Sequence, residues 1–394
     1  MRVALVSPKW NKMVNSYPPL GLGYLAAVLE RDEHEVAIFD LGLEPDAPLA
    51  LGVERVTGWN PELVGFTAMT NNYYSVEETV ALLRARIDVP VVLGGPHATL
   101  FPDRILSNPS VDYVIYGEGE ETLQELVRAM AQERPRPSDE RLRGIDGLAF
   151  VADDRAVVNA PRRLIRDLDA LPLPARHLFD LGRYPLYASD GEPMVTLLSS
   201  RGCPYNCSYC FKGIVGRTYR QRSAENVLAE IRHLLETYDY RHFYFIDDLF
   251  TLDRRRLAAL AEGIIAEGID IRWQCLARVD RVTPDLLQLM HRAGCREIHY
   301  GIESGDAEAL RRIGKGFSLS QVRDAVTWTA RARILAKGYF MLGLPGDTEA
   351  TMQETIRLAC ELELDQAMFS LTTPFPGTRL WDELVARQPE MVFD

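Results

Sequence analysis

The first third of the chain alternates short apolar runs with amphipathic stretches. The apolar runs predict strands near residues 3–6, 35–40, 63–67, 89–95 and 113–117. Strands that are apolar throughout are typical of a parallel sheet covered by helices on both faces. We therefore predict an α/β fold that begins with a doubly wound, Rossmann-like domain. Its ligand is expected beyond the carboxyl ends of the strands.

The same alternation returns in the second half of the chain after a different intervening stretch. Residues 131–142 are charged and contain prolines, and a Pro-rich segment follows at Leu171–Pro174. These features predict a linker over 136–190, between a domain at 1–135 and another at 191–385. In the second domain, apolar runs predict six strands, near 195–198, 242–246, 271–275, 297–301, 337–342 and 366–371. Six strands with intervening helices predict a partial (β/α)6, TIM-like barrel.

Composition narrows the class of protein. The chain has 394 residues, of which 47% are apolar and 25% charged, as in ordinary globular proteins. The net charge of −12 argues against a nucleic-acid partner. We expect no membrane span because no apolar run approaches about 18 residues. Reduced cysteines and the absence of a signal-peptide pattern at the first residues favour a cytoplasmic protein.

Three of the six cysteines, Cys203, Cys207 and Cys210, follow the first predicted barrel strand in a CxxxCxxC pattern. Thiolates at this spacing can converge on one loop around a metal centre. A 4Fe–4S cluster needs one ligand per iron, so three cysteines leave one iron open for a substrate or cofactor. A structural zinc site would need a fourth ligand, and no His lies beside the triplet. We favour the cluster over a zinc knuckle.

The run 199–211, which contains this triplet, closely resembles the radical S-adenosylmethionine superfamily. In that family the open iron binds S-adenosylmethionine, and one-electron cleavage gives a 5′-deoxyadenosyl radical that abstracts hydrogen from carbon. The resemblance implies that the three cysteines hold a 4Fe–4S cluster. It also implies contacts to S-adenosylmethionine from Tyr209, Arg278, Glu303 and Gly343.

Several polar residues near these strand ends keep two interpretations. Arg278 either clamps a carboxylate or pairs with Asp280. Asp247 and Asp248 either contact a ligand or cap a helix. His177, His299 and Tyr300 are candidate proton donors, although a structural role is the simpler explanation for each.

Four segments of the first domain, at 18–21, 64–67, 93–99 and 112–122, resemble a radical S-adenosylmethionine subgroup with an N-terminal cobalamin-binding domain. Taken singly, each is better explained by a tight turn or a helix start. Their order before a radical-type barrel favours cobalamin. The DxHxxG loop that supplies a lower-face histidine elsewhere is absent, so cobalt is expected without a His ligand. The implied cobalamin contacts are Thr67, Thr70, Gly94, Gly95, His97, Gly117, Glu118 and Gly119.

The resemblance implies a cobalamin-dependent enzyme that methylates an unactivated carbon of a small molecule through a 5′-deoxyadenosyl radical and methylcobalamin. Its electron donor would be a flavodoxin or ferredoxin. The alternative is a radical cyclase or rearrangement enzyme of the same subgroup. tRNA methylthiolation requires further N-terminal cysteines, and none precedes Cys203. A cobalamin or iron–sulfur sensor would explain the first domain but not the barrel.

Overall fold

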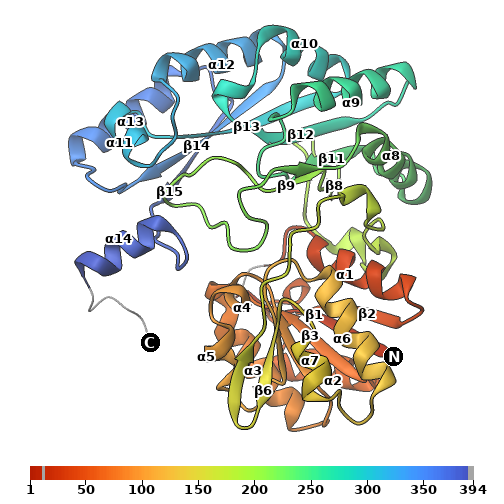
Figure 1. Cartoon of the computed structure of the whole chain (residues 1–394). Helices are drawn as coiled ribbons and strands as arrows, with labels where there is room; N and C mark the ends of the chain where they lie inside the picture. Colours follow the sequence, from red (N-terminus) through yellow and green to blue (C-terminus); the bar gives the residue numbers. More distant parts are fainter. Residues whose placement is uncertain (11–13, 389–394) are drawn as a thin grey trace. The chain divides into compact units, whose positions relative to one another are not determined.

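The structure, a computed structural model, describes residues 1–10 and 14–388 and consists of two compact units (Figure 1). Unit 1 comprises Met1–Arg166, Ala170–Leu186 and Gly213–Val215. Unit 2 comprises Asp167–Asp169, Tyr187–Lys212 and the chain from Gly216 onward. Each unit is built around its own sheet.

The sheet of unit 1 has the strand order β2-β1-β3-β4-β5-β6-β7. Its first five strands are parallel, so the predicted doubly wound domain is confirmed. The order reverses beside β1, which makes the β1/β3 boundary the switch point where such sheets bind ligands. The strands are β1 (Arg2–Ser7), β2 (Glu35–Asp40), β3 (Leu63–Thr67), β4 (Val91–Gly94), β5 (Tyr113–Ile115), β6 (Leu148–Ala152) and β7 (Arg155–Val158).

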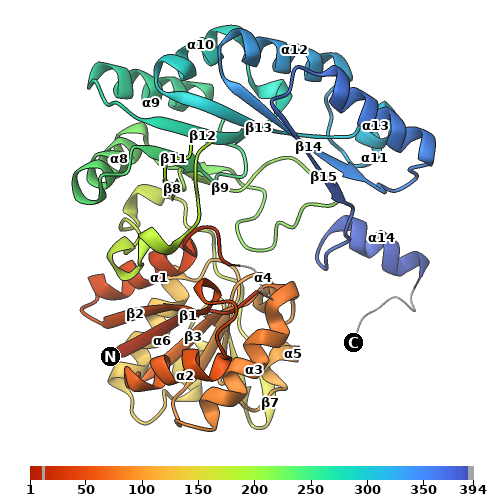
Figure 2. The same cartoon turned by 180° about the vertical axis from the view of Figure 1, so that it is seen from behind.

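Helices cover both faces of this sheet (Figure 2). Val3 and Leu5 of β1 pack with α1 and α6, whereas Ala4 and Val6 pack on the other face with α2 and α3. Successive side chains of a strand point to opposite faces, so a strand buried on both sides must be apolar throughout. The helices of unit 1 are α1 (Leu20–Arg31), α2 (Leu49–Gly58), α3 (Tyr73–Arg84), α4 (Pro96–Leu100), α5 (Pro102–Leu106), α6 (Glu120–Gln132) and α7 (Asp139–Arg143).

The stretch 136–190, expected as a linker, contributes two strands to the sheet of unit 1. β6 pairs antiparallel with β5, and β7 pairs antiparallel with β6. Asp153 and Asp154 form the two-residue turn between them, with φ of 49° and 57°. Positive φ at both positions is the requirement of a type I′ hairpin turn, and Asp tolerates it. The linker expected over 136–190 therefore does not extend over this hairpin, because β6 is hydrogen-bonded to β5 and belongs to the sheet of unit 1.

Unit 2 contains the predicted six-stranded partial barrel. All strands are parallel, in the order β15-β14-β13-β12-β11-β8. Figure 1 shows helices α9, α10 and α12 along one face of this sheet. The strands are β8 (Met194–Leu197), β11 (His242–Phe245), β12 (Arg272–Ala277), β13 (Cys295–Glu303), β14 (Leu335–Leu342) and β15 (Gln366–Leu371). The helices are α8 (Ala224–Tyr238), α9 (Arg254–Ala266), α10 (Pro284–Arg292), α11 (Ala307–Arg312), α12 (Leu319–Arg331), α13 (Glu349–Glu361) and α14 (Arg379–Arg387).

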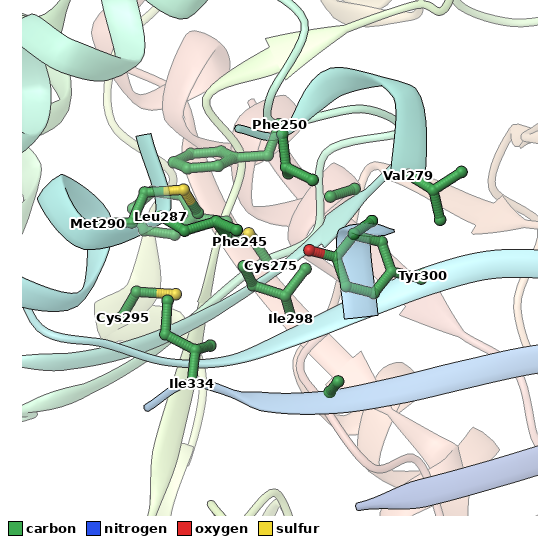
Figure 3. Packing of buried hydrophobic residues seen from close by; sticks show 14 of the residues in the cluster. Phe245, Phe250, Cys275, Val279, Leu287, Met290, Cys295, Ile298, Tyr300 and Ile334 are labelled. Atoms are coloured by element: carbon green, nitrogen blue, oxygen red, sulfur yellow. The ribbon is translucent and has the colours of Figure 1, made fainter. Parts of the chain in front are cut away.

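The two faces of this second sheet differ in chemistry. The helix side is apolar, and Figure 3 shows Cys275 and Cys295 within it, near Phe245 and Ile298. Both cysteines are completely buried there. Alternate positions on the same strands, such as His299, point to the opposite face. Cys275 and Cys295 are thus core residues, and the polar face of the sheet is the one available for chemistry.

One backbone position in this unit generates a stability prediction. Gly294, just before β13, has a φ of 96°, and a Cβ added there would lie 2.2 Å from the carbonyl oxygen of Ile271. Gly268 also has a positive φ, 65°, but nothing lies within 4 Å of its added Cβ. We predict that Gly268→Ala lowers the free energy of unfolding by about 1 kcal/mol through backbone strain alone. Gly294→Ala adds a clash with backbone and should cost about 3 kcal/mol or more.

Urea unfolding of the apoprotein, followed by circular dichroism, measures both costs. Equal losses in the two variants would contradict the close approach at Gly294.

Candidate functional site

The three clustered cysteines lie on one loop of unit 2, Cys203–Cys210, here called the cluster loop. It follows β8 and the short strand β9 (Ser200–Arg201), which pairs with β10 (Arg220–Gln221). Cys203 is buried, whereas Cys207 and Cys210 are half-buried. Burial raises the pKa of the Cys210 thiol, and the charges of Asp248 and the two other thiols add to the rise. The loop therefore carries the three cysteines at the carboxyl end of a barrel strand, where barrel chemistry occurs.

A buried carboxylate fixes the point where the chain enters the cluster loop. Asp247, at the end of β11, is completely buried and accepts hydrogen bonds from the Ser199 amide (3.2 Å), the Ser199 hydroxyl (2.8 Å) and the Ser200 hydroxyl. Arg256 of α9 donates to the same Ser199 hydroxyl at 3.0 Å. Burial raises the pKa of Asp247, against the lowering effects of Arg256 and the serines. Of the two candidate acids, Asp247 is thus an anchor, and Asp248 is the exposed one.

Backbone contacts hold the far end of the cluster loop. The Ser208 amide donates to the carbonyl oxygen of Ile313 at 2.9 Å, and the Ser208 carbonyl accepts from the Leu380 amide at 2.8 Å. Ile313 lies at the end of α11 and Leu380 in α14. The loop is therefore held by protein contacts before the first cysteine and between the second and the third.

Glu303, at the end of β13, lies where the sequence predicted a cofactor contact. Its carboxylate accepts a hydrogen bond from the Tyr209 hydroxyl at 2.9 Å and pairs with the Lys315 ammonium at 2.9 Å. Glu303 has a φ of 71°, a conformation that costs energy for a residue with a side chain and is typical of functional sites. Gly301 leaves room for this pair, since a Cβ there would lie 2.6 Å from the Glu303 carboxylate. The structure brings the Tyr209 and Glu303 side chains together.

Lys315 is the residue of this group that the sequence analysis missed. Its side chain is buried and also donates to the Gly301 carbonyl oxygen at 3.0 Å. The signal that could have revealed it is its place between two glycines, Gly314 and Gly316, in the connection after α11.

The two other predicted S-adenosylmethionine contacts lie in different surroundings. Arg278, just after β12, makes two hydrogen bonds to Asp280, at 2.9 and 3.3 Å, so the pairing considered as an alternative is the one observed. Gly343, just after β14, has open space around the position of an added Cβ. Backbone at that position is accessible to a ligand, whereas the Arg278 guanidinium is engaged.

The candidate proton donors also separate. His299 lies on the polar face of the sheet, where its Nε2 is 2.7 Å from the Glu297 carboxylate and its Nδ1 is 3.3 Å from the Tyr244 and Tyr339 hydroxyls. Tyr300 is buried on the helix side, and its hydroxyl lies 2.8 Å from that of Thr329, as expected of a structural residue. His177, in unit 1, is exposed, and its Nε2 lies 2.9 Å from the Glu30 carboxylate.

A single metal ion and a 4Fe–4S cluster require different arrangements of the three thiols. Within residues 1–10 and 14–388, no three His, Cys, Asp or Glu side chains are placed to surround one ion. A 4Fe–4S cluster has a different requirement, because each thiolate binds a different iron and the sulfur atoms stand further apart. The cluster loop carries three cysteines, which is the number of protein ligands that leaves one iron of such a cluster open.

The second candidate site lies in unit 1, where loops follow β3, β4 and β5. Gly95 has a φ of 98°, and a Cβ added there would lie 2.9 Å from the Thr67 hydroxyl, so these two predicted residues are in close contact. A Cβ on Gly94 would lie 3.7 Å from the carbonyl oxygen of Ile115 at the end of β5. Gly117 and Gly119 flank Glu118 in the loop after β5. The loops thus present backbone at the switch-point edge of the sheet.

His97 and Glu118 are the buried polar residues of these loops. The His97 ring stacks on Tyr73 with a centroid distance of 4.1 Å, and its Nδ1 lies 3.3 Å from the Thr70 hydroxyl. Burial lowers the pKa of His97 to about 4, so its imidazole is neutral at pH 7. The Glu118 carboxylate accepts a hydrogen bond from the Ile165 amide at 2.8 Å, which ties this loop to the later chain of unit 1.

A cavity of about 190 Å³ lies elsewhere in unit 1, at the end of β2. Its lining includes Asp40, Arg183 and Tyr184 and none of the predicted cobalamin contacts. The glycine-rich loops therefore do not line this cavity.

Fold and site together define a protein with a doubly wound domain and a partial barrel that carries a three-cysteine loop at its carboxyl end. Family models agree: the B12 binding domain matches residues 11–127, and the radical SAM superfamily matches residues 197–359. The chain is 35% identical to "Uncharacterized methyltransferase PH0819" of Pyrococcus horikoshii over 98% of this chain and 83% of that protein. It belongs to the radical SAM superfamily and carries a B12-binding domain, as the sequence predicted.

Two further proteins are similar to this chain, one in sequence and one in fold. It is 30% identical to the anaerobic magnesium-protoporphyrin IX monomethyl ester cyclase of Cereibacter sphaeroides, over 100% of this chain and 65% of that enzyme. The radical S-adenosylmethionine methyltransferase TsrM of Kitasatospora setae, solved with tryptophan substrate and a SAM analog bound, matches with a TM-score of 0.82. That match covers 98% of this chain and 76% of TsrM at 22% identity, so it supports the fold. In the described part of the chain, no helix is long and apolar enough to cross a membrane.

The buried imidazole in unit 1 generates a pH prediction. The pKa of His97 falls from 6.5 in the unfolded chain to about 4 in the fold, so only the unfolded state binds the proton between these values. The contribution of the neutral His97 to the free energy of unfolding is full above pH 6.5 and falls as the pH drops from 6.5 towards 4. We predict that His97→Phe, which keeps the ring stacking but cannot titrate, removes part of that loss.

Urea unfolding of both proteins at pH 7, 6, 5 and 4.5 measures the difference. Identical pH dependence of wild type and variant would contradict the buried, neutral His97.

Proposed function

We propose that this chain is a cobalamin-dependent radical S-adenosylmethionine enzyme that methylates a carbon of a small molecule. The observation that carries the proposal is the cluster loop, which carries three thiols at the mouth of a barrel and contacts Glu303 through Tyr209. The same chain also has glycine-rich loops at the switch point of a doubly wound domain, and these loops support cobalamin as the second cofactor. Unit 1 and unit 2 each contribute one part of the chemistry.

The cluster loop fits a 4Fe–4S cluster with three protein ligands. Cys203, Cys207 and Cys210 would each bind one iron, leaving the fourth for S-adenosylmethionine. When bound, the cluster supplies the electron that cleaves S-adenosylmethionine to the 5′-deoxyadenosyl radical. The protein contributes a loop that Asp247 holds at its entrance and that backbone hydrogen bonds hold at Ser208, which reduces the cost of ordering it on binding.

The residues around Glu303 fit the polar end and the adenine of S-adenosylmethionine. A carboxylate accepts hydrogen bonds from an ammonium group, and Glu303 lies at a strand end beside the loop. Lys315 and the Tyr209 hydroxyl hold that carboxylate in one position. Tyr209 through its backbone and Gly343 through the open space beside it would contact the adenine. Arg278 was predicted as a fourth contact.

The loops of unit 1 fit a flat corrin that approaches backbone rather than side chains. Glycines remove the side chains that would prevent such an approach. Thr67 and Thr70 place hydroxyls there, and a neutral His97 offers a hydrogen bond without a charge to desolvate. When bound, cobalamin supplies the methyl transfer, chemistry that side chains do not provide. Gly94, Gly95, Gly117, Glu118 and Gly119 complete the proposed contacts.

Methylation is favoured over the second candidate, radical cyclisation or rearrangement. The relative at 35% identity carries a methyltransferase name, whereas the cyclase of Cereibacter sphaeroides is 30% identical. "Hopanoid C-3 methylase" of Methylococcus capsulatus, 27% identical over 97% of this chain, is a second relative whose name states methylation. The proposal includes reduction by a flavodoxin or ferredoxin in the cytoplasm.

Two substrate-independent reactions test the proposal. Wild-type protein, reconstituted anaerobically with iron, sulfide and cobalamin, is incubated with methyl-labelled S-adenosylmethionine and a reductant. We predict about four irons per chain, formation of 5′-deoxyadenosine, and transfer of label to the cobalamin. Cys210→Ala should lose most of the iron and all of the 5′-deoxyadenosine, because one cluster ligand is gone.

Cys360→Ala is the matched control, since Cys360 is an exposed lone cysteine on α13. It should behave like the wild type. 5′-Deoxyadenosine without labelled cobalamin would favour the cyclase, and no 5′-deoxyadenosine from an iron-loaded protein would refute the radical enzyme.

A further inference from the structure

Tyr205, a cluster-loop residue with no predicted role, contacts two arginines. It lies between Cys203 and Cys207. The guanidinium carbon of Arg278 stands 3.5 Å from the centroid of its ring, which is direct stacking. Its hydroxyl accepts a hydrogen bond of 2.5 Å from Nε of Arg281. The ring and the hydroxyl of Tyr205 are therefore both held by residues that follow β12.

Arg278 itself is fully engaged on one edge. Nε and Nη2 donate to the two oxygens of Asp280, and Nη2 also donates to the Lys315 carbonyl oxygen at 2.5 Å. Two-pronged recognition of a carboxylate needs two guanidinium nitrogens on one free edge. Because both protons of Nη2 and that of Nε are used, only Nη1 is left. The Arg278 side chain is also buried, and its guanidinium carbon lies 5.2 Å from the centroid of the Phe317 ring.

We propose that Arg278 is a positioning residue that holds the cluster loop through Tyr205, and that it does not bind S-adenosylmethionine. The inference rests on the proposed function, in that it assigns a role at the same site. Arg278 joins the end of β12 to the middle of the CxxxC segment through the Tyr205 ring. Through the Lys315 carbonyl it also fixes the connection whose ammonium holds Glu303. The Arg278 guanidinium thereby contacts both the cluster loop and the connection that carries Lys315, the partner of Glu303.

The contact predicts different consequences for different substitutions. Tyr205→Leu and Arg278→Met each remove the stacking. Tyr205→Phe keeps the ring and loses only the acceptor for Arg281. Arg278→Lys keeps the charge but loses the planar group that stacks and forks, so it should not restore the wild-type behaviour.

The first measurement uses the full-length apoprotein and needs no cofactor. The alkylation rates of Cys203 and Cys207 by iodoacetamide are followed by mass spectrometry, with the exposed Cys360 as internal reference. We predict that Tyr205→Leu and Arg278→Met raise both rates about tenfold relative to Cys360, whereas Tyr205→Phe changes them by less than about twofold. The double variant Tyr205→Leu, Arg278→Met should be no faster than either single variant, because the two residues act through one contact.

The second measurement uses protein reconstituted with iron and sulfide. Iron per chain should fall in Tyr205→Leu and in Arg278→Met to a similar extent. For the cluster-loaded fraction, the Kd for S-adenosylmethionine should stay within about twofold of wild type.

The opposite pattern overturns the proposal. If Arg278 binds S-adenosylmethionine, Arg278→Met raises that Kd about tenfold or more while alkylation rates and iron content stay at wild-type values. Tyr205→Leu would then affect neither. If Arg278→Met does not fold, Tyr205→Leu decides alone, since unchanged alkylation in that variant refutes the contact. Wild-type protein that binds no iron would refute the proposed function, but the alkylation experiment would still decide the role of Arg278.

Discussion

The arrangement of unit 2 depends on holding a three-thiol loop in place with protein contacts alone. The buried carboxylate of Asp247 is the central one, because it binds the amide and two hydroxyls of the residues that lead into the loop. A buried carboxylate needs hydrogen-bond donors from the protein. Ser199 and Ser200 donate to Asp247, and Arg256 donates to the Ser199 hydroxyl. Its neighbours are thereby restricted to one geometry. The cluster loop, β9 and the end of β8 all follow from this contact.

The same principle applies at the other wall of the barrel mouth. Glu303 is held by Lys315 and Tyr209, and its left-handed backbone is maintained by that surrounding structure. Strain of this kind persists only where the neighbours over-determine it. Removing one partner of a buried ion pair leaves an unpaired charge, so the network tolerates little variation. A site that must keep a reactive radical away from its own side chains benefits from such rigidity.

The sequence predicted more of the fold than of the contacts. Strands buried on both faces are apolar throughout, so the first five strands of unit 1 could be found from pattern alone. The six barrel strands were found from shorter apolar runs, although one face of their sheet is polar. The β6–β7 hairpin was missed because its turn is Asp153–Asp154 rather than the usual Asn-Gly. Cys203, Cys207 and Cys210 were found by spacing. Lys315 and Tyr205 were not, because their partners, Glu303 and Arg278, lie on other elements and only folding brings them together.

The most direct test of the account is whether the cluster has one iron without a protein ligand. Mössbauer spectroscopy of protein reconstituted with ⁵⁷Fe, before and after S-adenosylmethionine is added, reports on each iron site. The account predicts that one iron in four changes its isomer shift on addition, because Cys203, Cys207 and Cys210 ligate the other three. Four equivalent irons that do not respond to S-adenosylmethionine would show a closed cluster with a fourth protein ligand and would contradict the account.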